Sequence, residues 1–305
     1  MAVTPKNAAT VILLRNREPG GFDVFLLKRH AKSSFMGGNY VYPGGRVDPN
    51  DGFSETQSLS KGMTFEEAQK ILGGDTLTSL GSFAHWIAAI RELFEEAGVF
   101  LAYDQEGNLF HLKNRDEREK FLDYRKRLQE GKTNICEIVQ KENLLLALDQ
   151  LYYYAHWITP EAQSQRFDTR FFLTRYPFGQ EASHDQKETT AGMWITPKKA
   201  LEENLKGEVI LSPPTLKTLE DLSRFKSIEE VFNSHKKRGI RSILPILTTI
   251  SGGPLIIFPW DPEYESFQRG EIVSPINHGR PSQPGDNTTR LLMKEGRWLP
   301  FYRHK

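Results

Sequence analysis

Residues 91–99 have the sequence RELFEEAGV, and this stretch decides the fold of the chain. Glu95 and Glu96 follow Glu92 by three and four positions, so on an α-helix all three carboxylates project from one side. Arg91 lies four positions before Glu95, near enough to hold its carboxylate. Because like charges repel, the cluster gives an exposed helix no stability. An ordinary surface helix with an acidic face is the alternative interpretation.

The surrounding residues predict the extent of this helix. Residues 82–98, SFAHWIAAIRELFEEAG, predict an amphipathic helix with an apolar stripe opposite the carboxylates, formed by Ile87, Ile90, Leu93, Phe94 and Ala97. Ser82 is predicted to be its N-cap, and Gly98 is predicted to end it.

A second stretch, residues 42–52 (YPGGRVDPNDG), complements the helix. Gly44 and Gly45 predict a tight turn whose bare backbone can approach a ligand closely. Asp48 and Asp51 follow the turn. Mg²⁺ is a hard cation that is held by carboxylates and backbone carbonyl oxygens, usually alongside substrate phosphates. The turn and the helix together therefore predict a metal site that serves a phosphate compound.

The two stretches together resemble the box of the Nudix hydrolases, G-x5-E-x7-R-E-U-x-E-E-x-G-U, in which U is aliphatic. Gly45 stands at the first glycine of the box, and Asp51 stands where glutamate is usual. The remaining positions are filled in register by Arg91, Glu92, Leu93, Glu95, Glu96, Gly98 and Val99. Between Asp51 and Arg91 lie 39 residues instead of seven, so the resemblance implies an insertion of about 32 residues inside the box.

The resemblance covers most of residues 8–265 and is similar in detail to the subgroup of mammalian Nudix family member 19, a peroxisomal coenzyme A diphosphatase. It implies an α/β (α+β) Nudix fold, in which a mixed central sheet is sandwiched between helices, with inserted helices and a C-terminal β extension. We expect one Nudix domain over residues 1–265, with insertions at about 52–84 and 113–149. Residues 266–305 are expected to form an extension packed on the same domain.

The resemblance also implies the metal ligands. Glu95 and Glu96 would be the main ligands of Mg²⁺ or Mn²⁺, with Glu92 as a further ligand and Gly45 contributing its backbone oxygen. Arg91 would orient the glutamates rather than touch the substrate.

Further residues of the implied site lie outside the helix. A distant acid, either a metal ligand or the general base, is expected just before a Trp-bearing strand, and Glu188 has that placement, with Asp185 and Glu181 as rivals. Substrate contacts are expected from Arg29, Met36, Gly44, Gly45 and Arg46.

The implied activity is hydrolysis of a nucleoside diphosphate linked to another group, at the pyrophosphate. Coenzyme A or acyl-coenzyme A is the first substrate hypothesis. A dinucleotide or nucleotide sugar, such as NADH or ADP-ribose, is the second. An interpretation of another class is a catalytically silent Nudix module that binds a nucleotide or a partner protein. Homodimers are frequent in the family, so a homodimer is also expected.

Several other polar residues have two interpretations. His85 and His156 lie among aromatic residues and are predicted to be core or hydrogen-bonded histidines. Arg166 and Arg170 either meet a substrate phosphate or pair with Asp168 and nearby acids.

The composition limits partners and location. The formal net charge is +1, with 40 basic and 39 acidic side chains, so no overall field favours nucleic acid. The single cysteine, Cys136, excludes an intramolecular disulfide and is compatible with a reducing compartment. We find no signal peptide and no apolar run long enough to cross a membrane, and the ending FYRHK is not a peroxisomal signal. A cytoplasmic protein without membrane or nucleic-acid partners is expected.

The remaining secondary structure follows from local patterns. We expect a single core sheet with helices on both faces. Strands are predicted at 8–14, 22–28, 39–42, 99–103, 151–160, 166–177 and 191–196, with strand pairs within 242–259 and 290–302. Helices are predicted at 64–72, 197–207, 212–225 and 227–239, and two or three within 115–149. Residues 277–287 are predicted to be a linker.

Overall fold

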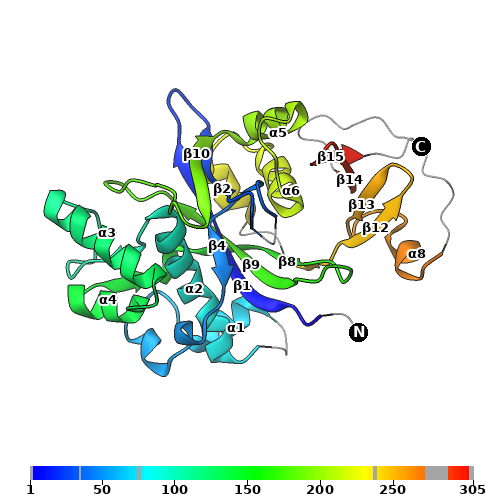
Figure 1. The fold of residues 1–305 in the computed structure, drawn as a ribbon. Helices are drawn as coiled ribbons and strands as arrows, with labels where there is room; N and C mark the ends of the chain where they lie inside the picture. The colour runs from blue at the N-terminus through cyan, green and yellow to red at the C-terminus, as the bar shows by residue number, and fades with distance from the viewer. Residues whose placement is uncertain (1–2, 34–35, 74–76, 236–238, 272–287, 302–305) are drawn as a thin grey trace.

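The computed structural model describes residues 3–33, 36–73, 77–235, 239–271 and 288–301 of the chain (Figure 1). The predicted linker at 277–287 lies outside these residues. Among the described residues, no helix has the length and apolar character needed to cross a membrane.

A mixed sheet forms the centre of the molecule, with strand order β10-β2-β1-β9-β8-β11. β3 pairs with β2, and β4 pairs with β1. β1 runs parallel to β9 and antiparallel to β2 and β4, which confirms the mixed central sheet. The strands are β1 (Lys6–Asn16), β2 (Phe22–Arg29), β3 (Tyr40–Val41), β4 (Gly44–Arg46), β8 (Tyr152–Ile158), β9 (Phe167–Arg175), β10 (Thr189–Ile195) and β11 (Ser242–Ile243).

The uninterrupted apolar run in β1 is explained by cover on both faces of the sheet. Val11 and Leu13 belong to one hydrophobic cluster, whereas Ile12 and Leu14 belong to another. The first cluster contains α1 (Phe65–Leu72), α2 (Ser79–Ala97), α3 (Arg115–Gln129) and α4 (Ile135–Glu142). The second contains α5 (Pro197–Lys206), α6 (Pro213–Leu222) and α7 (Ile228–His235). The sheet is therefore sandwiched between helices, as predicted (Figure 1).

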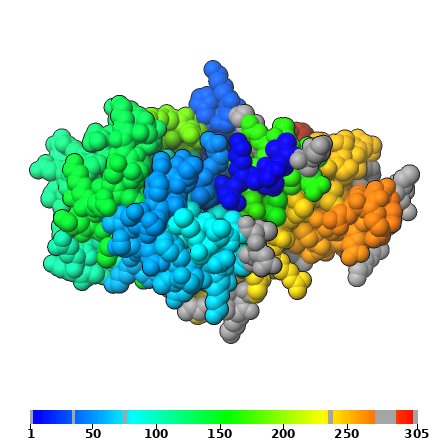
Figure 2. All heavy atoms as spheres, turned by 90° about the horizontal axis from the view of Figure 1, so that it is seen from below, coloured from blue at the N-terminus to red at the C-terminus, as the bar shows by residue number. Residues whose placement is uncertain are grey.

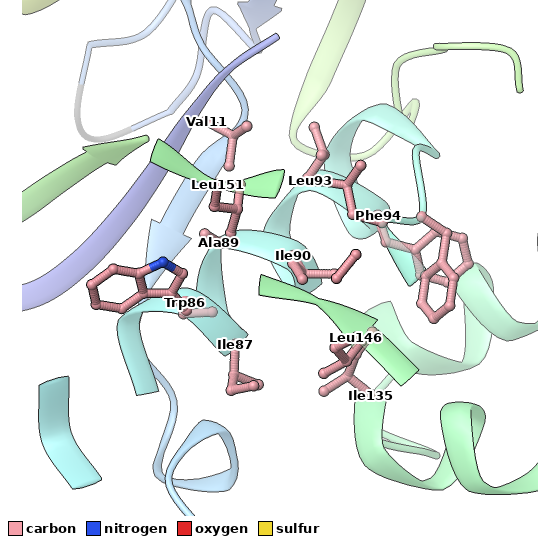
Figure 3. Packing of buried hydrophobic residues seen from close by; sticks show 14 of the residues in the cluster. Val11, Trp86, Ile87, Ala89, Ile90, Leu93, Phe94, Ile135, Leu146 and Leu151 are labelled. Atoms are coloured by element: carbon pink, nitrogen blue, oxygen red, sulfur yellow. The ribbon is translucent and has the colours of Figure 1, made fainter. Parts of the chain in front are cut away.

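Helix α2 lies between the sheet and the inserted elements. Figure 3 shows its side chains extending toward Val11 of β1 and, elsewhere, toward Ile135 of α4 and Leu146. Most of its residues are buried, and the buried set includes Glu92 and Glu96. The alternative of a surface helix with a solvated acidic face is therefore wrong, because Glu92 and Glu96 lie against the backbone of Gly44 and Gly45.

The start of α2 differs from the prediction. Thr78 is the N-cap, and its side chain accepts a hydrogen bond from the Gly81 N–H at 3.0 Å. The predicted N-cap, Ser82, lies inside the helix, because its N–H already donates to the Thr78 carbonyl at 2.8 Å. The predicted end is confirmed, since Gly98 adopts the left-handed conformation (φ 69°) that glycine accepts without steric cost.

Two smaller sheets accompany the central one, so the prediction of a single core sheet accounts for only part of the strands. The first has the order β12-β13-β14-β15 and includes the predicted C-terminal hairpin, and the second has the order β5-β7-β6. Their strands are β5 (Ser60–Lys61), β6 (Ala102–Tyr103), β7 (Leu145–Ala147), β12 (Ile246–Ile250), β13 (Gly253–Ile257), β14 (Arg290–Lys294) and β15 (Arg297–Phe301). The short α8 (Tyr264–Gln268) follows the strand pair at 246–257.

The insertions pack together rather than separately. β5, in the insertion at about 52–84, pairs with β7, in the insertion at about 113–149. Ser60 and Lys61 are the partners of Leu146 and Ala147. In Figure 2 the two insertions, light blue to cyan and green, form one continuous surface. The predicted helix at 64–72 is confirmed as α1, with Thr64 and Glu67 forming a capping box. The region 115–149 contains two helices, as predicted, together with β7 and the short 3₁₀ turn Leu148–Gln150. The domain boundaries stay a prediction.

Candidate active site

The glycine turn lies directly against α2, although 39 residues separate the two halves of the box. The Gly44 N–H donates a hydrogen bond to Glu96 Oε2 at 2.8 Å. At Gly45, a Cβ atom would lie 2.5 Å from Glu92 Oε1, closer than atoms can approach without a shift. Glycine at these two positions lets the backbone approach the Glu92 and Glu96 carboxylates closely.

Arg91 is the centre of a buried ion-pair network. Its Nη1 donates to Glu92 Oε1 at 2.8 Å and to Glu95 Oε1 at 3.2 Å. Its Nη2 donates to the carbonyl oxygen of Arg46 at 2.8 Å, which links α2 to β4. The contact between Arg91 and the glutamates that the sequence predicts is present.

Asp51 is the principal partner of Arg91. The guanidinium donates to both of its carboxylate oxygens, from Nε at 2.8 Å and from Nη2 at 2.9 Å. Asp51 Oδ2 also accepts the Asp48 N–H at 2.7 Å, within the 3₁₀ turn Pro49–Asp51. Because Asp51 is fully buried and both oxygens are engaged, the carboxylate at the first acidic box position anchors Arg91.

The glutamates carry more negative charge than their neighbours compensate. Burial raises the pKa of Glu92 to about 7, against the attraction of Arg91. Burial and the charge of Glu92 raise the pKa of Glu96 well above its usual value. Burial also raises the pKa of Glu95. Each of these carboxylates is costly to ionise without a further cation nearby.

This donor set fits a divalent cation in its chemistry. Carboxylates and a backbone carbonyl are hard oxygen ligands of the kind that Mg²⁺ and Mn²⁺ take. In the part of the chain that the structure describes, however, no three His, Cys, Asp or Glu side chains are arranged so that they could hold a metal ion. Glu92 and Glu95, which accept hydrogen bonds from Arg91, and Glu96, which accepts the Gly44 N–H, would have to turn their carboxylates toward the ion.

Glu188 comes to the same region from the β9–β10 connection. Burial is the main cause that raises the pKa of Glu95 and of Glu96, and the negative charge of Glu188 adds a smaller upward contribution to each. Its carbonyl oxygen accepts the His30 N–H at 2.8 Å, beside Arg29. The rival Asp185 is engaged in its own turn, where it accepts hydrogen bonds from the N–H groups of Lys187, Glu188 and Thr189. The placement therefore favours Glu188 over Asp185.

The predicted substrate residues are only partly brought together. Arg29, at the end of β2, is close enough to Glu96 for its charge to oppose the effect of burial on that carboxylate's pKa. Its Nε is buried and makes no hydrogen bond within the described structure. Arg46 contributes its carbonyl to Arg91, while the residue itself is exposed. Met36 adopts φ 52° in the β2–β3 connection.

The two histidines and Arg170 form a separate buried cluster. His85 is fully buried, and its Nδ1 lies 2.8 Å from the Gly81 carbonyl oxygen. Burial lowers the pKa of His85 to about 4, so this ring is neutral at physiological pH. His156 and Arg170 both contact the Asp168 carboxylate. The interpretation of hydrogen-bonded histidines, and of Arg170 paired with Asp168, is confirmed.

Arg166 is also accounted for by internal contacts. It donates to the Thr159 carbonyl at 3.0 Å and to the Val3 carbonyl at 2.7 Å.

The sequence interpretation missed Arg125 of the inserted helix α3. Arg125 is buried and donates to the carbonyl oxygens of Glu95 and Glu96 at 2.9 and 2.8 Å. One signal could have found it: Arg125 interrupts an apolar stripe of Phe121, Tyr124 and Leu128, all of which are buried. A charged residue in such a stripe needs a specific partner.

Substitution of Gly45 by alanine is expected to lower kcat at least about tenfold. The new Cβ would lie 2.5 to 2.7 Å from the three carboxyl atoms of Glu92, which the Arg91 bond restrains. Gly52→Ala is the matched control in the same loop, because its nearest contact would be an ordinary 3.5 Å to Ala84 Cβ. Steady-state kinetics of both variants provide the measurement. Equal activity in the two variants would contradict a functional role for the close approach.

The stability of the metal-free protein is expected to fall as the pH rises from about 6.5 to 8, by about 1 kcal/mol. The folded-state pKa values of Glu92, about 7, and of Glu96 exceed the usual 4.5, so the folded protein holds protons here that the unfolded chain has lost. His85 acts in the opposite direction but only below its unfolded pKa of 6.5. Urea unfolding in EDTA measures the slope, which should flatten in Glu92→Gln/Glu96→Gln. An unchanged slope in that variant would show that other groups cause it.

Comparisons with known proteins agree with this geometry. Acyl-coenzyme A diphosphatase NUDT19 of Xenopus laevis is 25% identical over 312 residues, which cover 90% of this chain and 82% of that protein. The protein of the same name from Gallus gallus is 26% identical over 316 residues, covering 91% of this chain and 81% of that protein. The chain therefore has relatives along most of its length.

A solved structure and a family model complete the comparison. The crystal structure of a NUDIX hydrolase from Alicyclobacillus acidocaldarius superposes with a TM-score of 0.62 at 24% identity, covering 76% of this chain and 96% of that one. This likeness confirms the predicted fold. The family model described as the NUDT19 Nudix domain matches residues 60–224, more than half of the chain. With the box helix and its glycine turn in contact, the chain belongs to the NUDT19 Nudix domain family.

Proposed function

We propose that this protein is a diphosphatase that hydrolyses the pyrophosphate of coenzyme A or acyl-coenzyme A with Mg²⁺ or Mn²⁺. As a Nudix hydrolase it acts on acid anhydrides of phosphorus. The relatives that match about nine-tenths of the chain carry the name acyl-coenzyme A diphosphatase. The observation that carries the proposal is the burial of the Glu92 and Glu96 carboxylates against the glycine turn, with Glu95 beside them on the same helix.

The residues of the cluster have distinct parts in this proposal. Glu92, Glu95, Glu96 and the Gly45 carbonyl would hold the ions. A bound divalent ion supplies neutralisation of the anhydride oxygens and lowers the pKa of its water. Asp51 and Arg91 keep the glycine turn and the helix in register.

Two further residues would act on the substrate and on water. The Glu188 carboxylate would accept the proton of the attacking water, because it is near enough for its charge to act on both Glu95 and Glu96. The Arg29 guanidinium, with its Nε free of hydrogen bonds within the described structure, would bind phosphate oxygens. The silent-module interpretation is disfavoured, because burying the Glu92 and Glu96 carboxylates together is costly unless a cation uses them.

A hydrolysis screen of the full chain tests the substrate. Coenzyme A, acyl-coenzyme A, NADH, ADP-ribose and a nucleotide sugar are each incubated with Mg²⁺, with Mn²⁺ and with EDTA, and the products are separated by chromatography. Metal-dependent release of a 4′-phosphopantetheine product from coenzyme A or its acyl form is expected at the highest kcat/KM. A higher kcat/KM on NADH or a nucleotide sugar would replace the substrate class, and no hydrolysis of any compound would favour the binding module. Cytoplasmic location and a homodimer stay predictions.

A further inference from the structure

The C-terminus of α2, where the metal-binding glutamates lie, is closed by groups from outside the helix. A helix leaves its last four carbonyl oxygens without partners of its own. The Phe94 carbonyl accepts the Gly98 N–H at 3.0 Å, which is the ordinary helix end. The next three carbonyls, those of Glu95, Glu96 and Ala97, accept from side chains of α3 and from the backbone of the β9–β10 connection.

Arg125 of α3 supplies most of these donors. Its Nε donates to the Glu95 carbonyl at 2.9 Å, and its Nη2 donates to the Glu96 carbonyl at 2.8 Å. Gln129, one turn later on α3, adds a bond of 2.7 Å to the Glu95 carbonyl. A guanidinium at this position also opposes the negative end of the helix dipole. Gly98 leaves room for it, since a Cβ there would lie 2.9 Å from Arg125 Nη1.

The same guanidinium binds the connection that carries Glu188. Its Nη1 donates to Ser183 Oγ at 3.1 Å, and its Nη2 donates to the Ser183 carbonyl at 2.9 Å. The Ser183 N–H in turn donates to the Ala97 carbonyl of α2 at 2.9 Å. Arg125 itself is only 6% exposed, whereas its partner Ser183 lies at the surface. One side chain thus joins α3, the end of α2 and the β9–β10 connection.

Further hydrogen bonds of the connection lie on both sides of Ser183. Gln180 accepts the Phe100 N–H at 2.8 Å and donates to the Phe100 carbonyl at 2.9 Å. Asp185 accepts the Glu188 N–H at 3.1 Å, and the Glu188 carbonyl accepts the His30 N–H at 2.8 Å. Asp185 follows Ser183 by two residues and bonds the Glu188 N–H, so Ser183 and the Glu188 backbone belong to neighbouring parts of one hydrogen-bonded segment.

We propose that Arg125 is a positioning residue of the active site. It sets the position of the Glu95 and Glu96 backbone relative to the connection that carries Glu188. The planar guanidinium can donate to two helix carbonyls and to Ser183 together, which a single ammonium cannot do in the same geometry. Arg125 lies in the inserted helix α3, so this insertion contributes directly to the arrangement of the site. The proposal rests on the assignment of the glutamates made above.

The Arg125→Lys variant of the full chain tests this role, because it keeps the positive charge and removes the fork. We expect Mn²⁺ binding without substrate, followed by electron paramagnetic resonance, to weaken about tenfold. The Mg²⁺ concentration that gives half-maximal activity should rise by a similar factor, while KM for the substrate changes less than kcat. Hydrogen exchange of residues 180–188 should also quicken. Arg127→Lys is the matched control, since this half-exposed side chain on the same helix is expected to leave all readouts unchanged.

The outcomes separate a positioning role from a structural one. A purely structural residue would lower the unfolding temperature and the amount of active enzyme, but would leave Mn²⁺ affinity per folded molecule unchanged, and that result would overturn the proposal. If Arg125→Lys does not fold, Ser183→Ala and Gln129→Ala remove one bond each, and wild-type Mn²⁺ affinity in both would also overturn it. Wild-type behaviour of Arg125→Lys beside an inactive Glu96→Gln defeats only this inference. Full activity of Glu96→Gln defeats the site assignment itself.

Discussion

Glu96→Gln is expected to lower kcat about 1,000-fold while leaving the protein folded. An amide oxygen is neutral and a weak ligand for a hard divalent ion, so the charge that the site offers to the metal is reduced. The shape of the side chain is kept, and the amide oxygen can still accept the Gly44 N–H that Glu96 now accepts at 2.8 Å. The measurement is kcat at saturating metal and substrate.

The stability of the same variant gives a second, independent readout. In EDTA its free energy of unfolding near pH 7.5 should equal or exceed that of the wild type, because burial raises the pKa of Glu96 and its ionisation is costly there. Glu66→Gln, an exposed glutamate on the neighbouring α1, is the control and should change neither quantity. Activity of Glu96→Gln close to that of the control would remove this residue from the site.

Asp51→Ala is expected to lower the free energy of unfolding by about 3 kcal/mol, because it leaves the buried Arg91 guanidinium without its bidentate partner. Burial lowers the pKa of Arg91, but the hydrogen bonds to Asp51 and the nearby carboxylates more than reverse this and raise it. Asp51 is fully buried, so water does not replace the lost contact. Urea denaturation monitored by tryptophan fluorescence measures the change.

Asp48→Ala is the matched control three residues earlier. This exposed residue caps the 3₁₀ turn through the Asn50 N–H, and its loss should cost only about 1 kcal/mol. Metal binding distinguishes the two variants further. Asp51→Ala should also weaken metal binding, because Arg91, which orients Glu92 and Glu95, loses its principal partner. Equal destabilisation by both substitutions would show that Asp51 acts through the turn and not through Arg91.

Much of the fold was accessible from sequence because the relevant signals are local. The apolar runs at 8–14 and 22–28, the capping box of Thr64 and Glu67, and the glycine at position 98 each depend on neighbouring residues only. The prediction of Ser82 as the N-cap was wrong, although capping is also a local signal. Thr78 is an equally suitable capping residue, and whether the helix continues to it depends on how residues 79–81 pack.

The environment of the site was not accessible in the same way. The spacing of the glutamates predicts a common side of the helix, but not that the glycine turn packs against that side. The bidentate pairing of Asp51 with Arg91 spans 40 positions, and the contact of Arg125 with the Glu95 carbonyl spans 30. No periodicity reports contacts over such distances.

The sequence by itself determined which residues bear the oxygen donors and that three of them share one side of a helix, because helical spacing is a property of consecutive residues. Only the tertiary structure decided that Asp51 holds Arg91, that Glu188 approaches Glu95 and Glu96, and that Arg125 closes the end of α2. These outcomes depend on burial and on partners from segments far apart in the chain. The physical reason is that a buried charge takes whichever partner the folded chain brings within hydrogen-bonding distance, and that partner is set by packing rather than by local pattern.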